Sequence, residues 1–183
     1  ISGNGKKTFA SKISESYSFT YDDISLLPDQ ISEIEHRAEC DTSVDFLGLR
    51  LSLPIIGSPM NTVVGGKMAK ALSELGCLGV VHRFNSIDEQ IREFSDNGMS
   101  DSPFKCPAVG INKSSDLDRL KRLADYGVKI VCIDIANGGS KMIEEFISAA
   151  GNIIKEYQIK IIAGNVASYE TTEFLIKIGV DAV

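Results

Sequence analysis

The sequence predicts an α/β fold built on a parallel sheet, and the clearest evidence lies in residues 128–166. Two runs rich in Ile and Val, 129–135 and 159–166, enclose residues 140–157, where apolar side chains recur three and four positions apart. Such apolar runs are typical of strands covered on both faces, and the interval between them is typical of an amphipathic helix. A strand, a crossover helix and a second strand form the unit from which parallel sheets are built.

The same alternation continues along most of the chain. Strands are predicted at 51–60, 78–81, 106–111, 129–135 and 159–166, with a sixth beginning at 180–183, and helices at 68–75, 86–94, 114–126, 140–157 and 168–178. Gly76, Gly127 and Gly179 follow three of these helices as stop signals. Ser86 and Glu89 stand in capping-box positions at the start of another.

Repeated β/α units favour a (β/α)8 TIM barrel. The complete fold takes about 250 residues, so this chain supplies roughly its first five to six β/α units. The sequence stops within a repeating unit, and we therefore expect a part of a longer barrel. A complete five-stranded doubly wound sheet is the alternative. Residues 1–16, rich in Gly, Ser and Lys, are predicted to be a flexible lead-in, and 17–183 the N-terminal part of a single barrel domain.

Composition excludes several classes of function. The formal net charge is −6, which argues against non-specific binding to nucleic acid. The four cysteines are scattered without a CxxC pair or histidines at ligand spacing, so neither a disulfide framework nor a metal site is predicted. No apolar run reaches the length of a membrane span, and the polar N-terminus lacks the apolar region of a signal peptide. The expected compartment is the cytoplasm.

Polar side chains follow the two central strands. Asp134 and Asn137 come after the first, and Asn165 after the second. Ligands of parallel α/β folds bind beyond the carboxyl ends of the strands, and a carboxylate is costly to bury there without a partner. These residues therefore favour a binding site. The alternative is that Asp134 caps the next helix and Asn165 closes a turn.

The other strand ends add further candidates. A cation, a carboxylate and carboxamides around one opening suit a polar, anionic small molecule; the set is Ser58, Met60, His82, Arg83, Asp134, Asn137 and Asn165. Asp134 could hold an amide or transfer a proton, and Arg83 could contact a phosphate or developing charge. Arg83 could instead pair with a carboxylate of a neighbouring helix, and Met60 could simply pack in the core.

Several segments together resemble one enzyme family. They are TYDDISLLP, HRAECDTSV, LPIIGSPMNTV, VVHRF, VCIDIANG, IIAGNV and GVDAV, and they cover roughly residues 19–183 in order and spacing. These segments are similar to the inosine-monophosphate dehydrogenase and guanosine-monophosphate reductase family. The resemblance implies a (β/α)8 barrel, usually a tetramer, that acts on a purine mononucleotide with a nicotinamide cofactor.

The choice between the two activities follows from details of these segments. Most dehydrogenases of the family insert a regulatory domain pair between the helix after VVHRF and CPAVGI, and this chain has no room for it. IDIANG and HRF look closer to the reductase, whereas SPM is similar to the dehydrogenase. The resemblance therefore implies a GMP reductase that converts GMP and NADPH to IMP, ammonia and NADP. An IMP dehydrogenase that forms XMP with NAD is the alternative, and a non-catalytic half-barrel that binds nucleotide or a partner is another.

Carried over residue by residue, the resemblance places Ser58, Met60 and Asn165 at the nucleotide substrate. The same resemblance gives catalytic roles to Asp134 and Arg83 and a cofactor site to His36, Arg37, Arg83, Asp134, Ile135 and Ala136. The reductase usually has lysine where Arg83 stands, and an arginine acts there as a fixed charge. The family's nucleophilic cysteine, and any bound monovalent cation such as K+, would lie beyond Val183, so the chain alone is expected to be inactive.

Overall fold

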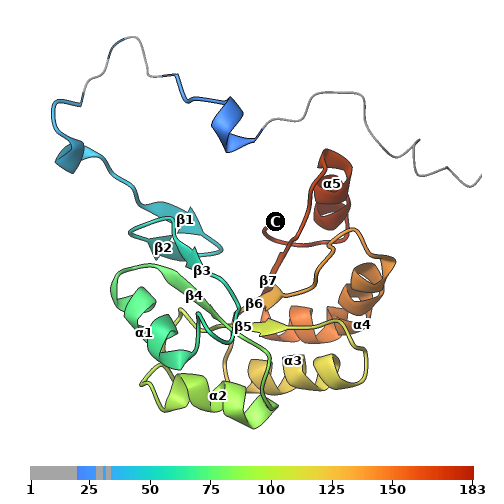
Figure 1. The fold of residues 1–183 in the computed structure, drawn as a ribbon. Helices are drawn as coiled ribbons and strands as arrows, with labels where there is room; N and C mark the ends of the chain where they lie inside the picture. Colours follow the sequence, from blue (N-terminus) through green and yellow to red (C-terminus); the bar gives the residue numbers. More distant parts are fainter. Residues whose placement is uncertain (1–19, 28–30, 32–33) are drawn as a thin grey trace, which may run out of the picture. The chain divides into compact units, whose positions relative to one another are not determined.

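A computed structural model of the chain describes residues 20–27, 31 and 34–183, and Figure 1 shows the order of their elements. The chain divides into two compact units, Ile1–Cys40 and Asp41–Val183. The predicted lead-in, residues 1–16, lies outside the described residues, and the domain boundary predicted at residue 17 stays a prediction.

The described part of the first unit contains two short 3-10 turns. The first, η2 (Tyr21–Asp23), is closed by a capping box in which the Thr20 backbone N–H and hydroxyl both donate to the Asp23 carboxylate, at 2.8 and 2.9 Å. The second, η3 (Arg37–Glu39), begins directly after His36. Each turn is three residues long, too short to stand without its local hydrogen bonds.

The second unit contains a five-stranded parallel sheet, as predicted. Its strands lie in chain order, β3 (Ile56–Gly57), β4 (Leu78–Val81), β5 (Cys106–Val109), β6 (Ile130–Ile133) and β7 (Lys160–Ala163). The connecting helices are α1 (Gly66–Glu74), α2 (Ile87–Ser95), α3 (Ser115–Asp125) and α4 (Lys141–Tyr157), and α5 (Tyr169–Lys177) follows β7. Ala182 then forms a parallel bridge with Ile162, where the sequence predicts another strand. The unit is an α/β half-barrel.

Local signals in the sequence fix the helix ends. The predicted capping box of α2 is present, because the Ser86 backbone N–H donates to the Glu89 carboxylate at 2.8 Å and the Glu89 N–H donates to the Ser86 hydroxyl at 3.2 Å. Gly127, with φ of 87°, follows α3 in the left-handed conformation that favours glycine. Among the described residues, no helix is long and apolar enough to cross a membrane.

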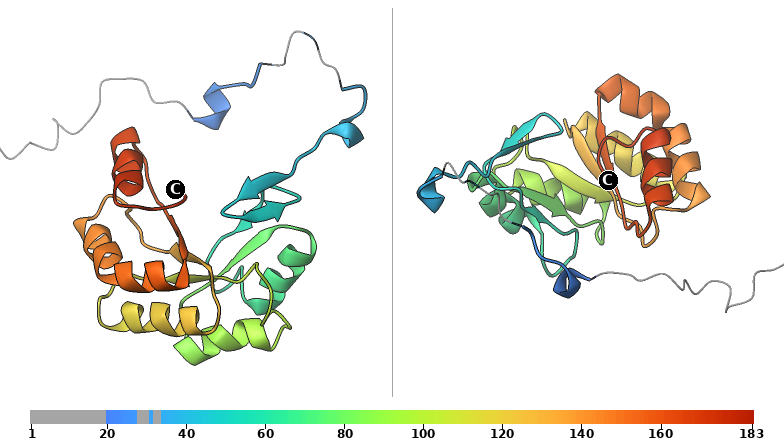
Figure 2. Two further views of the ribbon diagram at one scale, coloured as in Figure 1. Left: turned by 180° about the vertical axis from the view of Figure 1, so that it is seen from behind. Right: turned by 90° about the horizontal axis from the view of Figure 1, so that it is seen from above.

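The two faces of the sheet are covered differently. The helices lie along one face (Figure 1), and Figure 2 shows the same layer from behind and from above. Side chains that alternate along the strands therefore pack on opposite faces of the sheet. Val109, Val131 and Ile161 point towards the helices and share a core with Phe146 of α4. The opposite, inner face carries a second core, which contains Leu78, Val80, Cys106, Ala108 and Ile130.

A β-hairpin covers part of this inner face and corrects one prediction. The sequence predicts a single strand over residues 51–60. Instead β1 (Val44–Phe46) pairs antiparallel with β2 (Leu49–Leu51), and β3 is limited to two residues. The two residues of the turn, Leu47 and Gly48, have φ of 51° and 86°, as two-residue hairpin turns require. Leu49 and Leu51 are buried in the inner core.

Candidate functional site

One row of residues crosses the sheet where three strands end. The register pairs the last residues of β5, β6 and β7 with one another, so Gly110, Asp134 and Gly164 follow side by side. Successive residues alternate between the faces of a strand, and Ala108 and Cys132 two positions earlier belong to the inner core. Asp134 is therefore an inward carboxylate between two glycines, and a Cβ built at Gly164 would meet nothing within 4 Å.

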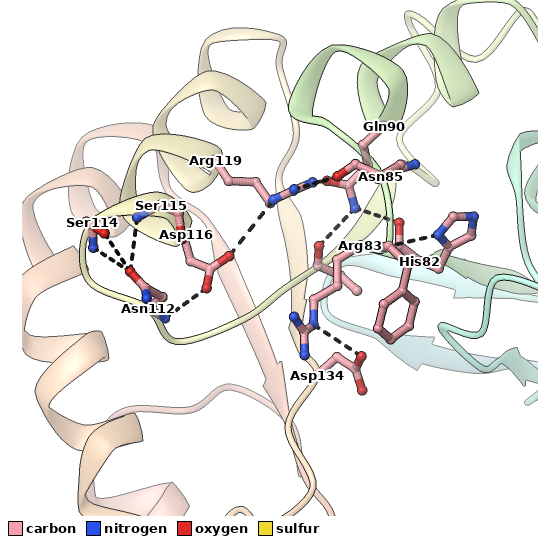
Figure 3. Close-up of polar contacts among 12 residues, drawn as sticks. His82, Arg83, Asn85, Gln90, Asn112, Ser114, Ser115, Asp116, Arg119 and Asp134 are labelled. Atoms are coloured by element: carbon pink, nitrogen blue, oxygen red, sulfur yellow. Dashed lines mark hydrogen bonds and ion pairs between the residues drawn. The ribbon is translucent and has the colours of Figure 1, made fainter.

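Arg83, which follows β4, reaches this carboxylate. Its Nε lies 3.4 Å from Asp134 Oδ2, with the two side chains 32% and 24% exposed, and Figure 3 shows the guanidinium directed at the carboxylate. The Nε atom is shielded from solvent and makes no hydrogen bond within the described residues, so the contact is electrostatic. At this exposure the pair adds little stability. Its importance is that it fixes two charges at one opening.

The structure decides two alternatives that the sequence left open, one for Asp134 and one for Arg83. Ser140, whose hydroxyl accepts from the Met142 N–H at 3.2 Å, caps α4, so Asp134 is not the cap of that helix. The partner of Arg83 is a carboxylate at a strand end and not one on a helix.

The two residues on either side of Arg83 in the sequence are aromatic and fix its position. The centre of its guanidinium lies 5.4 Å from the ring centroid of Phe84, a distance suited to a cation–π contact. The Phe84 N–H donates to His82 Nδ1 at 3.2 Å, and the two rings stack with centroids 6.3 Å apart. His82 is buried, so the segment that carries Arg83 is anchored immediately before it.

A pocket of about 180 Å3 brings several predicted residues together. Its lining consists of Pro59, Cys132, Ile133, Asp134, Ile162, Ala163, Gly164, Asn165 and Val183. Ser58 and Met60 flank Pro59, and the Met60 N–H donates to the Ser58 carbonyl at 2.8 Å. Met60 is 53% exposed, so it does not pack in the core of this chain. The loop after β3, Asp134 and Asn165 thus share one opening.

Asn165 has a left-handed backbone conformation and joins two loops. Its φ is 56°, a left-handed conformation that asparagine tolerates. Its side-chain amide donates to the Ile135 carbonyl at 2.5 Å, and its own carbonyl accepts from the Gly138 N–H at 3.2 Å. A Cβ at Gly138 would collide with the Gly164 carbonyl. Asn165 therefore positions the loop that contains the predicted cofactor residues Ile135 and Ala136.

Two predicted cofactor residues belong to the other unit. His36 and Arg37 lie at the start of η3 in the first unit, and their cofactor role stays a prediction. Within the described ranges, no group of three or more His, Cys, Asp or Glu side chains gathers to hold a metal ion. The opening is lined by the Asp134 carboxylate and the Asn165 amide, and the Arg83 guanidinium lies beside Asp134.

The sequence interpretation missed three polar residues behind Arg83. Gln90 of α2 and Arg119 and Asp116 of α3 form a connected group beneath the ends of β4 and β5 (Figure 3). A signal was available for Gln90, because it interrupts the apolar stripe of Ile87, Ile91 and Phe94 on α2. A polar residue on the buried face of a helix must find partners there.

Cys132 lies in the lining of the pocket, yet we expect its thiol to be unreactive. Burial, with a smaller contribution from the Asp134 charge, raises its pKa from an ordinary 9.0 to about 12. The reactive thiolate is therefore almost absent below pH 9. Iodoacetamide at pH 8 should label the exposed Cys40 first, as read by peptide mass spectrometry, and all four cysteines in urea. Rapid labelling of Cys132 in the folded protein would contradict this prediction.

The chain is similar to proteins of one known family. A sequence model of the family described as "IMP dehydrogenase / GMP reductase domain" matches residues 18–183. The chain is 33% identical over 171 residues to a GMP reductase of Staphylococcus carnosus (strain TM300), and 33% identical over 167 residues to one of Staphylococcus aureus (strain JH9). In both cases the match covers 90% of this chain and 49% of the relative.

A solved structure is similar over the same span. The inosine 5′-monophosphate dehydrogenase of Legionella pneumophila aligns with a TM-score of 0.73 and 30% identity, over 90% of this chain and 49% of that one. The chain thus spans about half the length of the relatives it matches.

Proposed function

The chain belongs to the IMP dehydrogenase / GMP reductase family, and from this premise we propose that the protein containing it is a GMP reductase. In the proposed reaction GMP loses its amino group as ammonia, NADPH is oxidised to NADP, and IMP is released. The similarity to two GMP reductases supports the choice of activity. The purine would be held through a covalent bond to a cysteine that lies beyond Val183.

The observation that carries the proposal is the environment of Asp134. Its carboxylate lies in a pocket that Cys132 and Ile162 also line, so an acceptor of hydrogen bonds stands beside an apolar surface. This combination fits a flat ring that bears an amide, because a carboxylate accepts strong hydrogen bonds from an amide NH2. The nicotinamide of NADPH is such a ring, and when bound it supplies the hydride. Asp134 would fix the orientation of the amide.

Arg83 would contribute a permanent positive charge. A guanidinium stays protonated at neutral pH, so this side chain is suited to stabilise negative charge and not to exchange a proton. On the nucleotide side, Ser58 and Met60 are exposed on the loop around Pro59, where they would offer a hydroxyl and an apolar contact. One N–H of Asn165 is committed to the Ile135 carbonyl, so we expect its carboxamide oxygen to face the nucleotide.

The activity is tested with the full-length protein, because the chain spans half of its relatives. One sample receives GMP and NADPH, a second receives IMP and NAD, and nicotinamide absorbance and purine products are followed in both. We expect NADPH to be consumed with equal amounts of IMP formed in the first sample only. Formation of XMP in the second sample would contradict the reductase assignment.

Two other functions are distinguished by the same assay. An IMP dehydrogenase is the second candidate, since the solved structure with a TM-score of 0.73 carries that name, and it would form XMP with NAD. A protein that binds nucleotide without catalysis would leave both cofactors unchanged. We further propose, from the family resemblance, that the protein is a homotetramer and that it acts in the cytoplasm. Light scattering of the full-length protein tests the oligomeric state.

A further inference from the structure

A fully buried glutamine connects the strand ends at the site to a helix behind them. The Gln90 side-chain amide donates to the Ala108 carbonyl at 2.9 Å and to the His82 carbonyl at 3.0 Å, and its oxygen accepts from Arg119 Nη1 at 2.7 Å. The first two bonds join β5 to the residue that follows β4. The third makes α3 part of the same network (Figure 3).

Arg119 extends this network to the segment that carries Arg83. Its Nη2 donates to the Asn85 carbonyl at 2.8 Å, and its Nε lies 3.9 Å from Asp116 Oδ1. The Arg119 side chain is only 13% exposed, and burial lowers the pKa of its guanidinium. A charge at such a site depends on its partners. Asn85 is two residues from Arg83. The planar guanidinium of Arg119 therefore fixes the backbone of the segment that carries Arg83.

Asp116 completes the contact with the site. Its Oδ2 accepts from the Asn112 N–H at 2.8 Å. A Cβ built at Gly110 would lie 2.5 Å from this oxygen and 3.3 Å from Arg83 Nη1. Asp116 Oδ2 and Arg83 Nη1 therefore lie on the same side of Gly110, in the row that contains Asp134. The network of Gln90, Arg119 and Asp116 thus extends to the surroundings of the ion pair.

We propose that Arg119 is a positioning residue for the Arg83–Asp134 pair. Through Gln90 and the Asn85 carbonyl it holds residues 82–86 in the path that directs Arg83 towards Asp134. This inference rests on the proposed function for its effect on cofactor binding, but the positioning itself does not. A lysine at 119 cannot donate to Gln90 and Asn85 in the same planar geometry, so positive charge alone would not restore the arrangement.

The positioning is tested without any ligand. We compare Arg119→Gln, Arg119→Lys and a control, Arg122→Gln, in the full-length protein by hydrogen exchange of peptides covering residues 82–86. Arg122 is also on α3 but pairs at the surface with Asp88. We expect about tenfold faster exchange of this segment in both Arg119 variants, because local opening follows the lost contacts, and no change in the control. Unchanged exchange in the Arg119 variants would overturn the proposal.

The link to the site is tested by a double-mutant cycle on the affinity for NADPH, measured by fluorescence. Arg119→Lys should weaken binding about tenfold, and the combination with Arg83→Gln should be no weaker than Arg83→Gln alone. Effects that add in full would mean that Arg119 acts only on stability, and would overturn the inference. Failure of the wild type to bind NADPH would instead contradict the proposed function, while the exchange experiment would still report on the positioning.

Discussion

Asp134→Asn should reduce kcat/KM for NADPH by about 10- to 100-fold, which corresponds to the loss of one hydrogen bond to a charged acceptor. The substitution keeps the size of the side chain but removes its charge. The amide of the nicotinamide ring would then meet a partner of half the acceptor capacity. Arg83 would lose the carboxylate that lies 3.4 Å from its Nε. Steady-state kinetics with GMP in excess measures the change, and KM for GMP should be almost unaffected.

The control for this prediction is Asp45→Asn. Asp45 also pairs with an arginine, since Arg50 Nη1 lies 3.1 Å from its Oδ2, but it belongs to the hairpin and its side chain faces solvent. This variant should keep wild-type kinetics. If Asp134→Asn were as active as Asp45→Asn, the carboxylate would have no part in cofactor binding.

Gly110→Ala should both destabilise the protein and weaken cofactor binding. The added methyl group would lie 2.5 Å from Asp116 Oδ2 and 3.3 Å from Arg83 Nη1, so two charged side chains must move to admit it. Insertions of this kind into packed regions cost about 1–3 kcal/mol in the free energy of unfolding. Urea denaturation measures that cost. Fluorescence titration with NADPH should show weaker binding, because the displaced Arg83 no longer faces Asp134.

A second glycine provides the matched control. Gly151 lies in the middle of α4, and a Cβ built there meets nothing within 4 Å. Gly151→Ala should therefore stabilise the protein by about 0.5–1 kcal/mol, since alanine loses less backbone entropy in a helix. Opposite signs at the two positions would locate the cost of Gly110→Ala in the crowded space above β5. A stable Gly110→Ala protein with normal NADPH affinity would refute that explanation.

The repeated units of the sheet could be read from the sequence because each element has a strong local signal. The run Ile130–Ile133 is apolar without interruption, and α4 shows a regular apolar stripe over seventeen residues. The polar residue after such a strand must lie at the end of the sheet, which is why Asp134 could be predicted as part of the site. Its partner, Arg83, could be placed at the end of another strand, two positions away in the sheet, but the two residues could not be paired.

The hairpin could not be predicted, for a different physical reason. Its strands are three residues each, and its turn uses Leu47, a residue type that rarely has positive φ. The conformation is held by tertiary packing, since Leu49 and Leu51 are buried against the inner face of the sheet. The local conformational preferences of these residues therefore do not predict the hairpin.

The network behind the site was hidden because it depends on contacts between separate helices. Gln90 and Arg119 are 29 positions apart, and each could equally occupy a solvated helix face. Only the packing of α2 and α3 beneath the sheet places them together. Spacing along one helix reports which face is apolar, but it does not report which polar side chain crosses to the next helix.

Two cations, Arg83 and Arg119, and two anions, Asp134 and Asp116, lie together at and behind the site, so their charges cancel. At distances greater than a Debye length, this group of four side chains is close to electrically neutral. Long-range attraction by these four groups therefore does little to accelerate the arrival of an anionic nucleotide. Recognition by Arg83 and Asp134 operates at close range, through the orientation of each side chain.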